Sequence, residues 1–128
     1  GLTGQAEAVL SEIAEMLKRL LDAGSEDSID LRGLPLSPAD RDWLDARLGR
    51  GEVEIVMNAG GKSVLAETAY PGVWRIVHQD PQGRVLAELI EVAPVPAIVR
   101  ADRADIATGY ESLLLNSQGN PQEGEDGE

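Results

Sequence analysis

Cysteine is absent from the 128-residue sequence, and histidine occurs once, as His78. Without thiolates the chain cannot form disulfides, ligate an iron–sulfur cluster through cysteine or build a cysteine-rich zinc site. A metal site would need His78 together with carboxylates such as Asp80 or Glu88. A single histidine on a strand is more often structural than a ligand, so the sequence predicts no bound metal and no cofactor.

Aromatic and basic residues are also scarce. Phenylalanine is absent, so the core must be built mainly from Leu, Val, Ile and Ala, with two tryptophans and two tyrosines. The chain has 23 acidic side chains against 11 basic ones, and its formal charge is −12. Such a surface repels phosphate backbones and anionic lipids, which argues against nucleic acid and membranes as partners.

Long apolar runs are missing as well. No stretch is long enough to span a bilayer, and the N-terminus has no basic segment followed by an apolar one. We therefore expect a soluble, cytoplasmic domain. The first residue is Gly1 rather than an initiator methionine, which raises the expectation that the chain is a piece of a longer protein.

A strand, a tight turn and a capped helix are expected in quick succession near the start of the chain. Residues 29–32 alternate between apolar and polar, which predicts a short strand that stops at Gly33. The Ser37 hydroxyl can accept a hydrogen bond from the free amide of Asp40, whose carboxylate is favourable near a helix N-terminus. This pattern predicts a helix that begins after Ser37 and ends at Gly49.

Hydrophobic periodicity predicts the helix and strands on either side of this unit. In residues 5–23 apolar side chains recur at spacings of three and four, which favours a helix packed on a sheet over a free partner-binding helix. From residue 52 the period changes to two. Alternating runs at 52–57, 64–70, 73–79 and 85–92, joined by short turns, predict an antiparallel meander. Both faces of the last two strands are fairly apolar, so we expect cover on both sides or a partner.

The end of the chain predicts one more helix and a tail. Pro94 and Pro96 mark an edge or crossing segment, because proline cannot donate to a sheet. Asp102 can cap a helix that carries Ile106, Tyr110, Leu113 and Leu114 on one side. We predict an α+β fold in the order α-β-α-β-β-β-β-α, with a mainly antiparallel sheet and the helices packed on one face. Residues 3–116 form a single domain in this prediction, and residues 117–128 form an acidic, flexible tail.

No motif in the sequence indicates catalysis. The run Gly60-Gly61-Lys62-Ser63 resembles the end of a phosphate-binding loop, but that loop needs a glycine where Val56 stands and a helix after the serine. A hairpin turn is the better interpretation. Asp30 and Asp40 are explained more simply by a strand-edge charge and a cap than by an acid–base pair. We therefore predict no catalytic residues and a protein that is not an enzyme.

The segment from Tyr70 to Trp74 is the best candidate for partner binding. It combines an aromatic residue, a rigid Pro-Gly turn and a tryptophan, and aromatic residues are the commonest anchors of protein interfaces. The alternative, that Trp74 faces the core, is slightly favoured for that residue alone. We hypothesise that a partner docks across this segment, with two charged residues upstream as polar contacts: Tyr70, Pro71, Val73 and Trp74, with Asp30 and Arg32.

Two segments of the chain resemble the HupH/HyaF family of hydrogenase expression/formation proteins. They are Ile-Asp-Leu-Arg-Gly-Leu-Pro-Leu-Ser-Pro-Ala-Asp at residues 29–40 and Glu-Thr-Ala-Tyr-Pro-Gly-Val-Trp at residues 67–74. The order of the elements and the segment 91–96 before the last helix are similar to that family's C-terminal domain. The similarity extends from about residue 6 to residue 115, and neither motif is catalytic.

The resemblance implies a non-catalytic maturation factor or chaperone for a nickel–iron hydrogenase. It implies a role with the precursor of the small, iron–sulfur subunit before twin-arginine export. Other maturation proteins would also be partners, and homodimerisation stays open. Members of the family can be longer, often with a related domain upstream.

Two alternatives of other classes stay open. The first is a small-molecule or metal-binding regulatory domain with a pocket near His78. The second is an uncharacterised enzyme, for which a deep pocket with clustered polar groups would be expected.

Overall fold

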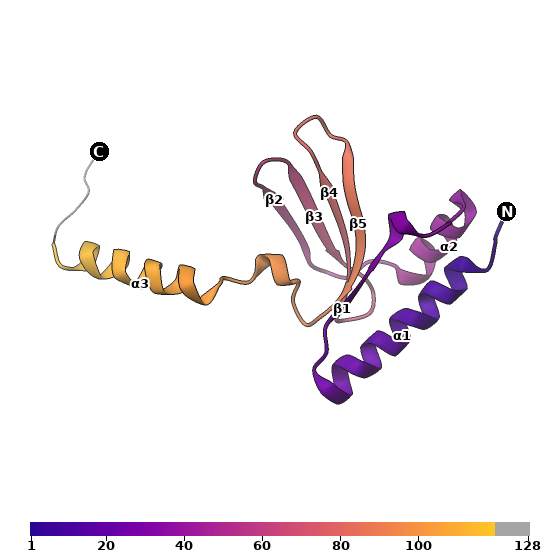
Figure 1. Ribbon diagram of the computed structural model, residues 1–128, viewed down its shortest axis with the longest axis horizontal. Coiled ribbons are helices and arrows are strands. Elements are labelled where there is room, and N and C mark those ends of the chain that lie inside the picture. The colour runs from indigo at the N-terminus through magenta and orange to yellow at the C-terminus, as the bar shows by residue number, and fades with distance from the viewer. Residues whose placement is uncertain (120–128) are drawn as a thin grey trace. The chain divides into compact units, whose positions relative to one another are not determined.

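The computed structural model describes residues 1–119, and the chain divides into two compact units, one of residues 1–97 and one that begins at Ile98. The expected order of helices and strands is confirmed, and the fold is α+β (Figure 1). The domain end expected at residue 116 stays a prediction, and residues 120–128 of the predicted tail lie outside the described residues. The elements are α1 (Gln5–Ala23), β1 (Asp27–Asp30), η1 (Leu31–Gly33), α2 (Pro38–Leu48), β2 (Glu54–Asn58), β3 (Lys62–Glu67), β4 (Val73–Gln79), β5 (Val85–Val92), η2 (Ala97–Val99) and α3 (Arg103–Ser117).

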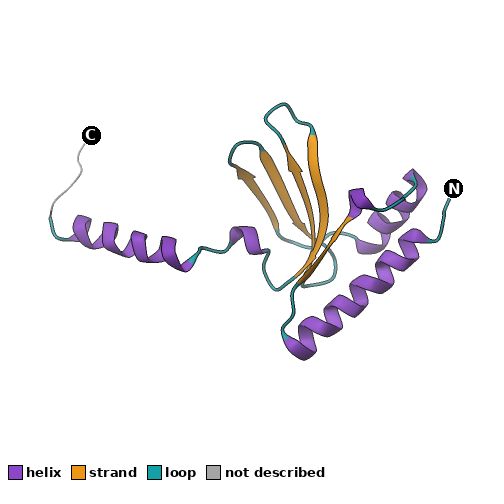
Figure 2. Cartoon of the chain, viewed as in Figure 1, coloured by secondary structure: helices purple, strands orange, loops and turns teal. Residues whose placement is uncertain are grey.

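The five strands form one antiparallel sheet in the order β1-β5-β4-β3-β2. Strands β2 to β5 form the expected meander, in which each strand pairs with the next along the chain (Figure 2). Strand β1 pairs with β5 at the edge, with Ile29 opposite Ile90. This pairing joins segments about 60 residues apart, which periodicity in the sequence does not predict.

Helices α1 and α2 share their core with one face of the sheet. Their buried side chains pack with those of β4, β5 and η1, and almost all of them are aliphatic, as the lack of phenylalanine requires. Packing of this core, rather than helix propensity, holds the two helices in place. The buried members of this core are Ala6, Val9, Ile13, Met16, Leu31, Leu44, Leu48, Val73, Ile90 and Val92.

The other face of the sheet is buried along its central strands. Leu65, Trp74 and Ile76 are buried, and Trp74 follows the core residue Val73, so its side chain points to the opposite face. The chain after β5 returns to this face. The Trp74 indole N–H donates to the carbonyl of Ala93 at 3.1 Å, and the backbone N–H of Ala97 donates to the Glu91 carboxylate. The segment that contains Pro94 and Pro96, expected to be an edge or crossing segment, therefore helps to cover this face of the sheet.

Several predicted boundaries are wrong by two or three residues. The strand expected at residues 29–32 begins at Asp27 and ends at Asp30, because the Asp30 carboxylate accepts from the Arg32 backbone N–H and turns the chain into η1. The strands expected at 52–57 and 64–70 lie at 54–58 and 62–67. At the start of α3, Asp102 makes no capping hydrogen bond with its side chain.

The predicted start of α2 is confirmed in detail. The Asp40 backbone N–H donates to the Ser37 hydroxyl at 3.0 Å, and the Asp40 carboxylate accepts from the Ser37 backbone N–H at 3.0 Å. This reciprocal pair is a capping box. The buried Asp40 carboxylate also accepts from the Thr3 hydroxyl and from the Thr3 backbone N–H, which ties the N-terminal segment to α2.

Replacing Ser37 with Ala should lower the free energy of unfolding by about 1 kcal/mol, because the Asp40 N–H loses its acceptor. Ser11→Ala in the exposed middle of α1 is the matched control and should leave stability unchanged or slightly higher. Urea unfolding followed by circular dichroism measures both. An unchanged midpoint for the Ser37 variant, at unchanged slope, would show that the cap does not stabilise α2.

No helix within residues 1–119 is both long enough and apolar enough to cross a membrane.

Candidate partner-binding surface

The turn between β3 and β4 is held rigidly by hydrogen bonds. The buried Thr68 hydroxyl accepts from the Tyr70 backbone N–H at 3.1 Å, and the Tyr70 carbonyl accepts from the Val73 backbone N–H at 3.0 Å. Gly72 has a φ of 91°, a conformation that glycine adopts without strain. Pro71 is exposed, and Tyr70 is 49% exposed. The turn therefore presents Tyr70 at the surface in a fixed position.

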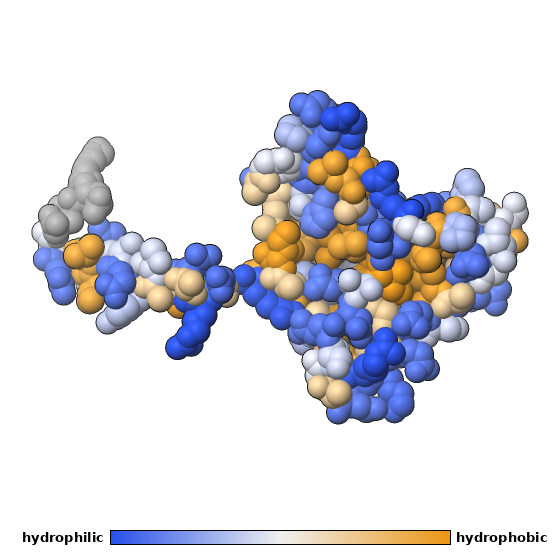
Figure 3. Space-filling model, viewed as in Figure 1, coloured by the Kyte–Doolittle hydropathy of each residue, from blue (hydrophilic) through white to orange (hydrophobic). Residues whose placement is uncertain are grey.

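Tyr70 lies at one side of an apolar hollow against α1, which we call the α1–corner groove. Its volume is about 250 Å³. Leu10, Ala14 and Leu17 follow one another at spacings of four and three, so they share one face of α1, and exposed Leu21 continues that face. Figure 3 shows apolar side chains gathered on the visible surface of residues 1–97. The groove is lined by Leu10, Ile13, Ala14, Leu17, Leu48 and Tyr70.

Two of the residues predicted to contact a partner lie inside the protein. Val73 is fully buried in the core beneath α1 and α2, and Trp74 is 4% exposed on the opposite face of the sheet. This agrees with the core interpretation that the sequence slightly favoured for Trp74. Of the predicted segment, only Tyr70 and Pro71 reach the surface. Val73 and Trp74 anchor the start of β4, and thereby the turn that carries Tyr70 and Pro71. Binding of a partner by any of these four residues stays a prediction.

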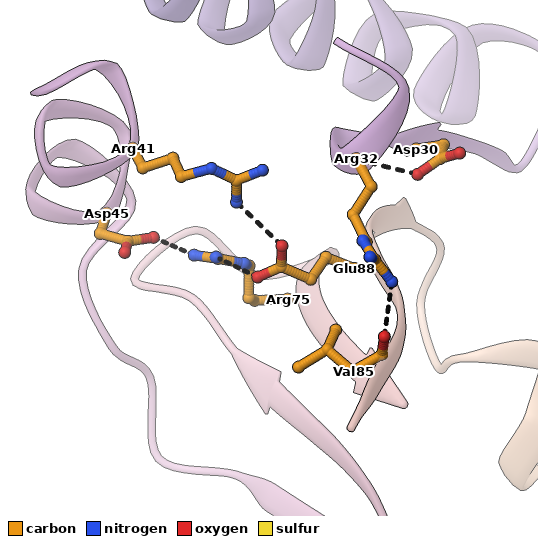
Figure 4. A network of polar contacts seen from close by, with 7 residues as sticks. All are labelled: Asp30, Arg32, Arg41, Asp45, Arg75, Val85 and Glu88. Carbon is orange, nitrogen blue, oxygen red and sulfur yellow. Dashed lines mark hydrogen bonds and ion pairs between the residues drawn. The ribbon is translucent and has the colours of Figure 1, made fainter. Parts of the chain in front are cut away.

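Asp30 and Arg32 line a different hollow, of about 390 Å³, together with Gly33, Leu86, Ala87 and Leu89 of η1 and β5. Figure 4 shows Arg32 directed at the Val85 carbonyl, to which its guanidinium donates at 2.5 Å. Asp30 of β1 pairs with Leu89 of β5. Val73, which begins β4 directly after the turn that carries Tyr70, pairs with Val92, at the other end of the same β5 segment. The structure therefore does not bring Asp30 and Arg32 together with Tyr70.

A network of ion pairs that sequence reasoning missed joins α2 to the sheet. The Glu88 carboxylate accepts from Arg41 at 2.9 Å and from Arg75 at 3.5 Å, and Arg75 also pairs with Asp45 (Figure 4). The Arg75 side chain is only 15% exposed, and within the described residues its Nε atom is buried without a hydrogen-bond partner. Two guanidiniums and two carboxylates neutralise one another here, so the network stabilises packing and offers no free acid or base.

His78 is paired with a serine on the neighbouring strand. Its Nδ1 lies 2.6 Å from the Ser63 hydroxyl oxygen, and the two residues are register partners in β3 and β4. Nearby Asp80 is engaged in its own turn, where hydrogen bonds from Arg84 and Gln82 lower the pKa of its carboxyl. Among residues 1–119 no group of three or more His, Asp and Glu side chains could hold a metal ion.

The glycine-lysine-serine run is a hairpin turn, as predicted. Gly60 and Gly61 have positive φ values of 71° and 144°, and Lys62 begins β3 rather than a helix. A Cβ atom at Gly61 would overlap the carbonyl oxygen of Gln79. Close approach of β3 to β4 therefore explains this glycine, and no phosphate is needed to do so.

Comparison with known proteins gives a consistent result. Residues 4–116 match the family described as HupH hydrogenase expression protein, C-terminal conserved region. The hydrogenase expression/formation protein HoxQ of Azotobacter vinelandii is 32% identical over 110 residues, which cover 84% of this chain and 39% of HoxQ. The hydrogenase-1 operon protein HyaF of Escherichia coli is 33% identical over 86 residues, which cover 67% of this chain and 30% of HyaF.

A solved structure has the same fold. The hydrogenase expression protein HupH from Thiobacillus denitrificans is 47% identical, with a TM-score of 0.85, and the match covers 92% of this chain and 98% of that one. The curated relatives are longer, and this chain spans about two fifths of the length of HoxQ.

Proposed function

Because this chain belongs to the HupH/HyaF family of hydrogenase expression/formation proteins, matching its C-terminal conserved region, we propose that it is a non-catalytic maturation factor for a nickel–iron hydrogenase. In this proposal it acts as a chaperone. Its client is the precursor of the small, iron–sulfur subunit, and other maturation proteins act beside it.

The α1–corner groove is the observation that carries the chaperone proposal. A client that is incompletely folded exposes apolar segments, and such a segment needs apolar surface on the protein that escorts it. The groove offers aliphatic side chains of α1 on one side and Tyr70, whose backbone is held by the turn, on the other. A rigid aromatic residue beside an apolar hollow is a common anchor for a bound segment.

The charge of the chain supports a basic client. The formal charge is −12, and acidic side chains are spread along the sequence. Complementary charge speeds the encounter of two proteins and selects among partners, although it adds less to affinity than buried contacts do. A precursor with an arginine-containing export signal fits this requirement.

The polar side chains that could be suspected of catalysis have structural partners. Asp40 caps α2 and binds Thr3, Asp80 closes the β4–β5 turn, and Glu88 pairs with two arginines. These contacts support an accessory role over a chemical one.

Replacing Tyr70 with Ala should weaken binding of the small-subunit precursor by about 30-fold, as for an interface anchor whose loss costs about 2 kcal/mol. Tyr70 is half exposed, so the variant should stay folded. Leu86→Ala is the matched control, because Leu86 is also exposed but lines the other hollow, with Asp30 and Arg32. Isothermal titration with the purified precursor measures both.

The experiment distinguishes binding in the α1–corner groove from binding in the hollow lined by Asp30 and Arg32. Parent-like binding by folded Tyr70→Ala would remove the α1–corner groove from the proposal. Weaker binding by Leu86→Ala, Asp30→Ala or Arg32→Ala would instead place the client on the hollow beside η1 and β5. Absence of any binding to the precursor by the parent chain would overturn the client assignment.

A further inference from the structure

Strand β2 forms an edge of the sheet that is open to pairing. It is the last strand in the sheet order, and its register with β3 is continuous from Glu54 to Asn58. Natural edge strands are commonly blunted by lysine, by proline, by a bulge or by shortness. Residues 53–58 contain neither lysine nor proline. At the opposite edge, β1 has only four residues, and its first residue, Asp27, is tied to Arg19 of α1 by an ion pair.

The backbone of β2 directs hydrogen-bonding groups out of the sheet. The Val53 carbonyl accepts from the Glu67 backbone N–H at 2.9 Å, so these two residues form a hydrogen-bonded pair. Hydrogen-bonded and non-hydrogen-bonded pairs alternate along an antiparallel ladder, so the N–H and C=O groups of Glu54, Val56 and Asn58 point away from β3. A helix cannot satisfy a row of such groups, because its own are paired internally. Another strand can.

The apolar side chains of this edge are complementary to themselves. In an antiparallel pair of two β2 strands, a two-fold axis at Val56 places the two Val56 side chains opposite each other, and this residue is 47% exposed. On the other face of the sheet, the half-buried Ile55 of each copy lies opposite the half-buried Met57 of the second copy. Each apolar side chain therefore meets an apolar one, which stabilises strand pairing.

The polar side chains match in the same register. The Glu54 carboxylate of each copy lies opposite the Asn58 amide of the second copy, which can donate to it. Lys62 is the β3 partner of Asn58, so its cation lies on the same face of the sheet, one strand further in. The single acidic residue of β2 thus meets a donor and a nearby cation, and the contact occurs twice.

We propose that two copies of the chain associate edge to edge through β2, joining their sheets into one antiparallel sheet with a two-fold axis at Val56. The outward-facing backbone groups of the two strands then pair with each other. Pairing covers the β2 edge of both copies, so the assembly closes as a dimer. Figure 1 shows β2 at the sheet edge farther from α1 and α2, which leaves space for a second sheet. The α1–corner groove is lined by no residue of β2, so a dimer keeps both grooves for clients.

Charge separates this dimer from a client bound at the same edge. Two five-residue strands make a small contact beside the roughly 1,200 Å² of a standard interface, so the dimer is weak and its population depends on concentration. Each copy carries a formal charge of −12, and added salt screens the repulsion between the copies. The dissociation constant of the dimer should therefore fall as salt is raised. A basic client segment on β2 would instead be released by salt.

Sedimentation equilibrium of the whole chain tests the association without any client, so its result is independent of the proposed chaperone function. The parent should dimerise, and Val56→Lys should raise the dissociation constant about tenfold, because two cations would meet at the two-fold axis. Val85→Lys is the matched control. It makes the same charge change at another exposed strand valine, 38% exposed on β5, and should dimerise as the parent does. Circular dichroism checks that each variant is folded.

A charge exchange tests the register, and it keeps the proposal testable if Val56→Lys fails to fold. Asn58→Glu gains a favourable partner in Lys62 of its own copy but faces Glu54 of the second copy, so it should stay folded and raise the dissociation constant about tenfold. Adding Glu54→Lys makes the facing charges opposite and should restore parent-like dimerisation.

Three results would overturn the proposal. The first is a parent that stays monomeric at every concentration and salt tested. The second is a folded Val56→Lys variant that dimerises as the parent does, or a Val85→Lys variant that is weakened as much as Val56→Lys. The third is a double variant, Asn58→Glu with Glu54→Lys, that dimerises no better than Asn58→Glu alone. A monomeric parent that binds a basic peptide through β2 would give this edge to a client instead.

Discussion

Replacing Trp74 with Ala should lower the free energy of unfolding by about 3–5 kcal/mol, the usual cost of deleting a buried aromatic side chain. Trp74 is buried on the sheet face opposite α1 and α2, and its indole N–H donates to the Ala93 carbonyl. The substitution leaves a void and also removes the donor that joins β4 to the chain after β5. The void and the lost hydrogen bond both weaken the packing of the chain after β5 on this face of the sheet.

Trp43→Ala is the matched control for this prediction. Trp43 is half-buried on α2, and the Arg47 guanidinium lies 4.6 Å from its ring centroid. Truncating a half-exposed ring removes less buried surface, and an exposed cation–π contact is worth about 0.5–1 kcal/mol, so the cost should be clearly smaller. Urea unfolding followed by circular dichroism gives both values. Equal costs for the two variants would show that Trp74 does not anchor the second face of the sheet.

Replacing Asp40 with Asn should destabilise the protein at neutral pH by more than Ser37→Ala does. The Asp40 carboxylate accepts hydrogen bonds from the Thr3 hydroxyl, the Thr3 N–H and the Ser37 N–H. An amide group has a single oxygen acceptor and an NH₂ group that would face donors, so at least one of these N–H groups loses its partner. A donor that loses its acceptor in this partly buried site is costly.

The same contacts make stability depend on pH. Hydrogen bonds from the Thr3 hydroxyl, followed by those from the Thr3 and Ser37 amides, lower the pKa of Asp40 from 3.8 to about 2. The unfolded chain therefore binds a proton at this position before the folded chain does. The stabilisation is fully present above about pH 5 and is lost progressively as the pH falls through 4 to about 2.

The difference in stability between the parent and Asp40→Asn isolates this group from the other carboxylates. It should be constant from pH 7 to about pH 5 and should shrink between pH 4 and pH 2. Asp42→Asn, at an exposed position on the same helix, is the matched control and should change little at any pH. Urea unfolding at each pH measures the difference. A difference that stays constant down to pH 2 would contradict the role of the Asp40 charge.

The local structure of this protein follows from residues that are close together in the sequence. The Ser37 cap, the hairpin at Gly60 and Gly61 and the strands at 73–79 and 85–92 were all predicted, because each depends on residues close together in the chain. The family could also be recognised from two local segments. Boundaries were less accurate where a side chain turned the backbone early, as Asp30 does at the end of β1.

Which residues lie together at a surface depends on long-range packing, which local patterns do not show. Tyr70 and Trp74 are four residues apart. Tyr70 nevertheless lines the α1–corner groove, whereas Trp74 is buried on the opposite face of the sheet and donates to the Ala93 carbonyl. The contact of Thr3 with Asp40 and the separation of Asp30 from Tyr70 likewise depend on how distant segments pack. Periodicity tells which face of an element is apolar, but not which segment will cover it, because that choice depends on long-range pairing such as β1 with β5.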